Sequence, residues 1–122
     1  MTHFRSWALG IALAVIAASA ASAGTLQTVQ AKGYLQCGVN TGLPGFGYPK
    51  ANGAWAGFDV DYCRAVAAAI FGDPGKVKFT PLDATQRFTA LQNSEVDLLV
   101  RNTTWTMSRD TTLGLKVAGV NY

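Results

Sequence analysis

The nine residues from Arg101 to Arg109 hold the densest group of side chains able to bind a ligand: two guanidiniums, one amide and four hydroxyls. The Arg109 guanidinium could pair with a carboxylate through two parallel hydrogen bonds, and a threonine hydroxyl or a backbone N–H could donate to the same group. Asn102 and Thr104 offer oxygen acceptors for an ammonium. A carboxylate clamp beside ammonium acceptors fits an α-amino acid as the ligand.

Some of these residues also have a purely structural interpretation. Thr104 or Thr106 could cap a short helical turn, and Arg109 could then be a solvated cation in its last turn. The acidic pair Asp59 and Asp61 could be a metal or acid–base pair. Because these two carboxylates stand where a strand gives way to a helix, we expect one of them to cap that helix and both to favour its positive end.

Strands and loops that would position these residues follow from the apolar pattern. Residues 96–100 form a nearly continuous apolar run, which is typical of a strand buried on both faces of a parallel sheet. Two further strands are expected at 35–39 and 76–81. Residues 45–57, with four glycines, predict a hairpin-like excursion, and 113–117 could begin another strand.

Two helices are expected between these strands. The first begins near Asp59, carries apolar residues at helical spacing and ends at Gly72. The second covers 85–93, where Phe88, Leu91 and Ala84 would share one side. The order β-α-β-α-β predicts a doubly wound α/β fold with right-handed crossovers. In such sheets ligands bind beyond the carboxyl ends of the strands, which selects the loops at 40–46, 82–87 and 101–109.

The first 23 residues have the pattern of a signal peptide. Arg5 provides a positive start, residues 8–18 are apolar, and Ala21-Ser22-Ala23 predicts cleavage before Gly24. The alternative is a retained membrane anchor, but a bilayer span needs about 20 apolar residues. We therefore expect residues 1–23 to be a cleaved signal peptide and the mature chain to be exported to the periplasm.

Composition excludes several classes of function for the mature chain. The only histidine, His3, lies in the predicted signal peptide, which excludes Ser-His and Cys-His hydrolases and a histidine-containing zinc site. No glycine-rich phosphate loop, EF-hand or metal cluster stands in the sequence, so we expect no cofactor. The basic residues form no continuous stripe, and we expect no nucleic-acid partner.

The two cysteines, Cys37 and Cys63, would both reach an oxidising compartment. An even number there permits one disulfide. Cys37 falls on a predicted strand and Cys63 on the helix expected to pack over it, so a bond is feasible. The alternative is two buried free thiols that behave as small hydrophobes.

Several segments, taken in order, resemble a known family. They are Gly38-Val39-Asn40, Gly57-Phe58-Asp59-Val60-Asp61, Arg87-Phe88-Thr89-Ala90-Leu91, Glu95-Val96-Asp97 and Arg101-Asn102-Thr103-Thr104-Trp105-Thr106, followed by Arg109. From Thr25 to Tyr122 the chain is similar to the first lobe of the polar amino-acid-binding proteins of ABC importers, and most to their general L-amino-acid-binding branch. The resemblance implies a type II periplasmic-binding-protein (flytrap) fold, an L-amino acid as ligand and an inner-membrane ABC permease as partner.

The resemblance also implies roles for individual residues. Arg109 would clamp the ligand α-carboxylate with help from Thr104, and Asn102 would lie near the α-ammonium. The remaining positions would line the side-chain pocket; they are Asn40, Leu43, Ala84 and Thr85. Relatives often carry an acid where Asn40 stands and an aromatic that stacks on the ligand where Leu43 stands, so the chain departs from the family pattern at both.

Members of this family have two lobes that close on the ligand. The sequence reaches Tyr122 about where the family would continue toward its first hinge crossing. We therefore expect residues 24–122 to be a truncated N-terminal lobe, with the second lobe absent, that binds amino acids and is no enzyme. One alternative is an exported dehydratase or cell-wall lyase with the same lobe architecture, which would have to use Asp83 or Asp110; the other is a non-binding remnant.

Overall fold

Three parallel strands form the centre of the fold in the computed structural model, which describes residues 24–122. Strand β1 (Leu35–Asn40) lies in the middle, with β4 (Val77–Leu82) on one side and β5 (Leu98–Leu99) on the other. The register pairs Leu35 with Val77 and Asn40 with Leu82, so the carboxyl ends of β1 and β4 meet at one edge. The predicted signal peptide, residues 1–23, lies outside the described residues.

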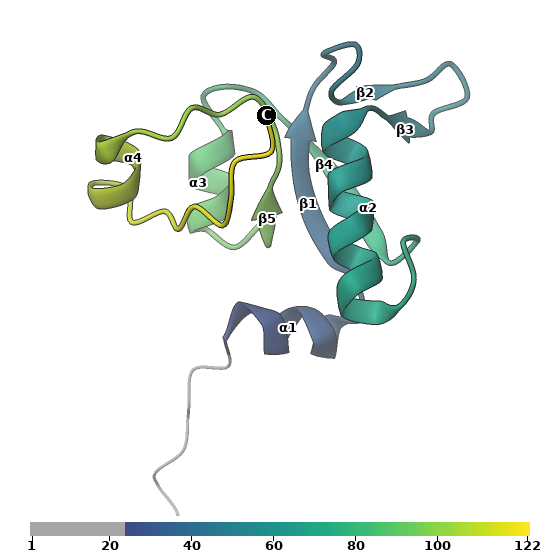
Figure 1. Cartoon of the computed structure of the whole chain (residues 1–122), viewed down its shortest axis with the longest axis horizontal. Helices are drawn as coiled ribbons and strands as arrows, with labels where there is room; N and C mark the ends of the chain where they lie inside the picture. Colours follow the sequence, from purple (N-terminus) through teal and green to yellow (C-terminus); the bar gives the residue numbers. More distant parts are fainter. Residues whose placement is uncertain (1–23) are drawn as a thin grey trace, which may run out of the picture.

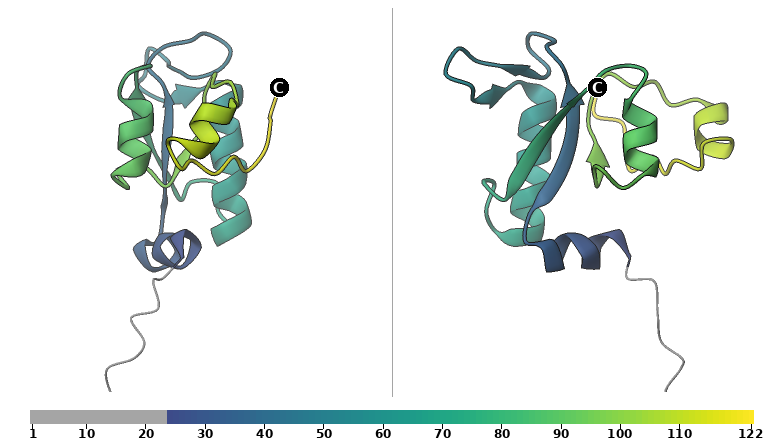
Figure 2. Two further views of the ribbon diagram at one scale, coloured as in Figure 1. Left: turned by 90° about the vertical axis from the view of Figure 1, so that its left-hand side faces the viewer. Right: turned by 180° about the vertical axis from the view of Figure 1, so that it is seen from behind.

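Helices cover both faces of this sheet. Helix α2 (Phe58–Phe71) packs on β1 and β4, and α3 (Arg87–Gln92) lies on the opposite face beside β5 (Figures 1 and 2). The expectation of a doubly wound α/β fold is confirmed. Strands β2 (Tyr48–Pro49) and β3 (Trp55–Ala56) form the expected hairpin above the sheet, and α4 (Met107–Thr111) stands apart on the side of α3 (Figure 1).

The sequence of α2 explains both its buried face and its end. Val60, Cys63 and Ala67 recur at helical spacing and are all fully buried. Gly72 ends the helix in the left-handed conformation, with φ of 71°, which costs glycine little. Its N–H donates to the carbonyl of Ala68 and so satisfies one of the last carbonyls of the helix.

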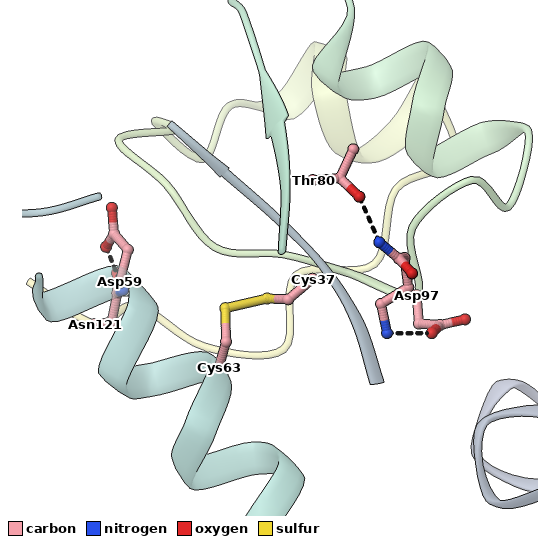
Figure 3. The surroundings of a disulfide bond; sticks show 7 residues. Cys37, Asp59, Cys63, Thr80, Asp97 and Asn121 are labelled. Atoms are coloured by element: carbon pink, nitrogen blue, oxygen red, sulfur yellow. Dashed lines mark hydrogen bonds between the residues drawn. A yellow bond between two sulfur atoms is a disulfide. The ribbon is translucent and has the colours of Figure 1, made fainter. Parts of the chain in front are cut away.

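A disulfide crosses the main core between the sheet and α2. Cys37 on β1 and Cys63 on α2 are bonded, with their Cα atoms 6.2 Å apart (Figure 3). Val39, Val60 and Val100 surround the bond and are buried with it. The bond that the sequence left open is therefore formed, and it ties the central strand to the helix over it.

Three local predictions were wrong in whole or in part, and one helix was not predicted. The strand expected at 96–100 contracts to Leu98–Leu99, because only the central pair aligns with β1, at Cys37 and Gly38. Residues 113–117 form no strand. Of the residues expected to share one side of α3, Leu91 packs against the core beside Ala90, but Ala84 is exposed before the helix begins, and the buried residues of the helix are Arg87 and Ala90. Helix α1 (Thr25–Lys32) lies across the lower end of the sheet (Figure 1). It was not predicted, and it has no side-chain N-cap hydrogen bond that would have indicated its start.

The prediction that an acid caps α2 was also wrong. Gly57 occupies the N-cap and Asp59 is the second residue of the helix. The Asp59 side chain is completely buried, and its Oδ1 accepts a 3.5 Å hydrogen bond from Asn121 Nδ2 (Figure 3). Its other oxygen has no partner among the described residues. Asp59 therefore connects α2 to the C-terminal segment and does not cap the helix.

Candidate ligand-binding site

The carboxyl ends of the three strands are joined by a chain of polar side chains. Arg101, which follows β5, donates from Nη1 to the carbonyl of Leu82 at the end of β4 and from Nη2 to Asn102 Oδ1 at 3.1 Å. Asn40, at the end of β1, donates from Nδ2 to the same Oδ1 at 3.0 Å. Asn40 and Asn102, both predicted as site residues, are therefore in direct contact.

Arg109, the last residue of the run 101–109, has its guanidinium held in place. Its Nη1 donates to the carbonyl of Thr104, and its guanidinium carbon lies 5.0 Å from the centre of the Phe88 ring. Thr106 caps α4 by accepting a bond from the Arg109 backbone N–H. Thr106 thus has the structural role considered from the sequence, whereas the half-buried Arg109 is not a freely solvated cation.

A third arginine, Arg87, supports the loop that follows β5. It is 8% exposed, and its Nη1 donates to the carbonyl of Asn102 at 3.2 Å and to Thr103 Oγ1 at 3.1 Å. It also packs on Phe88, with 4.7 Å from the guanidinium carbon to the ring centre. Burial, together with the neighbouring charges of Arg101 and Arg109, lowers the pKa of the Arg87 guanidinium below its ordinary value.

Thr85, predicted to line the side-chain pocket, is engaged with Asp83. Its hydroxyl and its backbone N–H both donate to Asp83 Oδ1, at 2.7 and 2.8 Å, and the N–H of Gln86 donates to the same oxygen. The Thr85 hydroxyl bond, followed by the Gln86 bond, holds the pKa of Asp83 below its ordinary 3.8. Thr85 therefore organises the turn that starts α3.

A cavity of about 680 Å³ opens beside these residues. Asn102, Thr104 and Arg109 line it, together with Phe88, the strand β5 and the C-terminal segment 115–122. Its volume is within the range of small-molecule sites. Asn40, Leu43 and Thr85 lie outside its lining, and Leu43 makes its main-chain bonds with Gly47 and Phe46 in the loop after β1.

Three residues at the site were not assigned a ligand contact from the sequence. Arg87 and Phe88 belong to α3, and Arg101 lies two residues after the end of β5. All three lie in or beside the loops at 82–87 and 101–109, which were selected because ligands bind beyond the carboxyl ends of parallel strands. That rule could have drawn attention to these residues. The burial of Arg87 and Arg101 could not be predicted from this rule, because arginines at loop ends are usually solvated.

Two negative observations apply to the described residues alone. Within 24–122, no three His, Cys, Asp or Glu side chains gather closely enough to hold a metal ion. None of the helices in the same range has the length and apolar character needed to cross a bilayer.

Comparison with known proteins places this arrangement in a family. Residues 35–116 match the bacterial extracellular solute-binding proteins, family 3. The chain belongs to this family. It is 62% identical over 117 residues to the general L-amino acid-binding periplasmic protein AapJ of Rhizobium johnstonii, covering 96% of this chain and 34% of that protein. It is 60% identical over 112 residues to the glutamate/glutamine/aspartate/asparagine-binding protein BztA of Rhodobacter capsulatus, covering 92% and 33%.

A solved member of the family shares the fold as well as the sequence. The periplasmic binding protein of an ABC transporter from Brucella ovis, determined with glutathione bound, is 73% identical with a TM-score of 0.79. The match covers 80% of this chain and 30% of that one. The chain thus spans about a third of the length of the family members it resembles.

Proposed function

We propose that residues 24–122 are the N-terminal lobe of a periplasmic amino-acid receptor that delivers its ligand to an inner-membrane ABC permease. Residues 1–23 would be the signal peptide that exports it. Membership of the solute-binding family supports this proposal, as does the strong identity to proteins named for binding amino acids in the periplasm. The observation that carries it is the guanidinium of Arg109, which is bonded to the carbonyl of Thr104 and lines the cavity together with Thr104.

The ligand carboxylate would bind to Arg109. A guanidinium has five N–H donors, and only Nη1 of Arg109 donates to another described residue, the carbonyl of Thr104. The remaining donors can pair with a carboxylate in a forked geometry. The Phe88 ring and the Thr104 carbonyl hold the guanidinium in one orientation, which reduces the entropy lost on binding.

The ligand ammonium would bind between Asn102 and Thr104. Asn102 Oδ1 already accepts two bonds, from Arg101 and Asn40, so the side chain is a poor acceptor for an ammonium. Its backbone carbonyl accepts one bond from Arg87 and keeps a second lone pair. We assign the ammonium to that carbonyl and to the Thr104 hydroxyl. Asn40, Leu43 and Thr85 would belong to the wall around the ligand side chain.

The names of the relatives fit a ligand defined by its α-amino acid group. BztA is named for four amino acids, and the Brucella protein holds glutathione, whose γ-glutamyl end carries a free α-amino acid group. The common element of these ligands is an ammonium beside a carboxylate. We infer that this chain binds the same element.

We also infer that the lobe does no chemistry on its ligand. The enzyme alternative needs a general acid or base, and Asp83 is the carboxylate nearest the strand ends. Three donors hold Asp83 Oδ1 and lower the pKa of its carboxyl group, so at neutral pH it has no proton to donate as an acid and is a weakened base.

The test is the ligand-dependent thermal melting of the whole natural protein that contains these residues. L-Amino acids should raise its Tm, while glycerol, sugars and bare cations should not. Arg109→Met should abolish the amino-acid shift because it removes the clamp, whereas Lys50→Met, at an exposed position of the hairpin, should keep it. An amino-acid shift of equal size in the Arg109→Met variant would refute the assignment.

A further inference from the structure

Helix α4, which carries Arg109, has few ties to the rest of the lobe. None of its five residues is buried, and Arg109 is the one residue among them that is not exposed. The side-chain hydrogen bonds of Thr106 and Thr111 that stabilise the helix stay within this segment. Gln92 on α3 holds the chain only beyond the helix, by donating to the carbonyl of Leu113. The place of the Arg109 guanidinium therefore depends on the contacts that its own side chain makes.

Arg109 contacts α3 at the ring of Phe88. Its guanidinium carbon lies 5.0 Å from the ring centre, and both side chains line the cavity. The electron-rich face of an aromatic ring attracts a cation. The hydrogen bond from Arg109 Nη1 ends on the carbonyl of Thr104, in the loop that leads into α4, so it does not fix the guanidinium relative to α3. Phe88 therefore provides the link between the guanidinium and α3.

A second guanidinium, that of Arg87, lies over the same ring. Arg87 is 8% exposed, and its bonds to the Asn102 carbonyl and to Thr103 Oγ1 keep it in place. Its guanidinium carbon lies 4.7 Å from the centre of the Phe88 ring. Two like charges so close together repel each other, and the ring attracts both. Without the ring, the less firmly bonded Arg109 would be the side chain that moves away.

We propose that Phe88 is a positioning residue of the carboxylate site, whose ring holds the Arg109 guanidinium in the orientation that binds the ligand. The inference rests on the proposed function, since it concerns the ligand group that binds at Arg109. Phe88 acts through Arg109 and needs no contact of its own with the ligand. Its effect on affinity should therefore be the same for every amino acid, whatever the side chain.

The size of the effect follows from the contact that is lost. An aliphatic side chain in place of the ring keeps an apolar group on α3 but removes the attraction for the cation. We expect the dissociation constant to rise about fivefold, which is equivalent to about 1 kcal/mol. The factor should be equal for L-glutamate and L-glutamine, which share the α-amino acid group and differ in side-chain charge. A ring that touched the ligand side chain would give unequal factors.

The experiment measures the dissociation constants of these two amino acids by isothermal titration calorimetry, for the whole natural protein and two variants. Phe88→Leu should raise both constants by the same factor, about fivefold. Phe88→Tyr keeps an aromatic face for Arg109 and should bind both amino acids within about twofold of the natural protein.

Phe79→Leu is the matched control. Phe79, on β4, also lies beneath an arginine, with 5.5 Å from the Arg64 guanidinium carbon to its ring centre, but it stands outside the lining of the cavity. This variant loses the same kind of contact away from the site. Both dissociation constants should stay unchanged, even if the variant melts at a lower temperature.

Two further measurements keep the test informative if Phe88→Leu does not fold. Phe88→Met replaces the ring by a flexible apolar side chain and should give the same loss as Phe88→Leu. In the natural protein itself, NMR should show nuclear Overhauser effects between the ring protons of Phe88 and the side-chain protons of Arg109.

The outcomes separate the two proposals. If no amino acid binds to the natural protein, the proposed function fails. If amino acids bind, the positioning role alone is overturned by an unchanged affinity in Phe88→Leu or Phe88→Met, or by unequal factors for glutamate and glutamine. It is overturned as well if Phe88→Tyr loses as much as Phe88→Leu, if Phe79→Leu loses the same, or if the Overhauser effects are absent.

Discussion

At the scale of single residues, Arg109 shows what residue type and spacing can predict about the candidate site. The run from Arg101 to Arg109 predicted Arg109, Asn102 and Thr104 as site residues, and all three line one cavity. The loop that carries Asn102 is held by Arg87 and Arg101, which donate to the main-chain carbonyls of Asn102 and Leu82, and Arg109 is held by the carbonyl of Thr104. Such bonds depend on the path of the backbone, which side-chain types alone do not reveal.

Asp59 is the residue for which the structure predicts an effect of pH on stability. Burial raises the pKa of Asp59 above its ordinary 3.8, against smaller opposing effects of the Asn121 hydrogen bond and the charge of Arg101; Tyr122 is the other titratable group facing it. A group with a raised folded pKa favours folding most below its unfolded value, and this contribution falls as the pH rises through the folded value. The free energy of unfolding of the natural protein should therefore fall, relative to Asp59→Asn, between pH 4 and neutrality.

Urea unfolding at several pH values measures this difference. Asp61→Asn is the matched control, because Asp61 lies in the same turn of α2 but is exposed and paired with Arg64. A difference that is constant with pH for Asp59→Asn, or that is the same for both variants, would contradict the account.

Gly57 connects the β2–β3 hairpin to α2, where it occupies the N-cap. Its φ is 118°, and a Cβ atom there would collide with the carbonyl of Phe46. Both the strained backbone and the collision penalise any side chain, so Gly57→Ala should cost at least about 3 kcal/mol of unfolding free energy. Gly53→Ala in the hairpin turn, with φ of 78° and open space around it, should cost only about 1 kcal/mol. Equal losses for the two variants in denaturant unfolding would show that the entry to α2 is less constrained than described.

At the scale of elements, the disulfide links β1 to α2. It closes a loop with a sequence separation of 26, for which the chain-entropy relation gives about 3.5 kcal/mol. Reduction should therefore lower the free energy of unfolding by a few kcal/mol. Guanidinium unfolding of the oxidised and reduced protein measures this loss, and coincident transitions would contradict a stabilising role for the bond.

The elements that the sequence predicted well are those with a strong period and a clear end. Helix α2 has both an apolar stripe and Gly72 at its end. Helix α1 has one buried residue, Val29, and no side-chain cap, so its position under the sheet depends on packing against β1. Strand β5 is short because pairing with β1, and not its apolar character, sets its length.

At the scale of the whole molecule, the C-terminal segment lies across the side of the sheet that carries α2 (Figure 2). Asn121 bonds to Asp59, and the ring of Tyr122 lies 5.1 Å from Phe46 and 5.9 Å from Phe58. The segment has no strand of its own, so the pattern at 113–117 was misleading. Its contacts are single side chains far apart in the sequence, which no local pattern could predict.

The central claim is that Arg109 binds the α-carboxylate of an amino acid, with Thr104 beside it in contact with the same ligand. The most direct measurement is an NMR titration of the ¹⁵N-labelled natural protein with L-glutamate. It follows the Arg109 Nε–Hε resonance and the Thr104 amide resonance. The account predicts saturable shifts of both, with the Nε–Hε resonance of Arg64 unchanged as the internal reference. Saturable binding of glutamate that leaves the Arg109 and Thr104 resonances in place would contradict it.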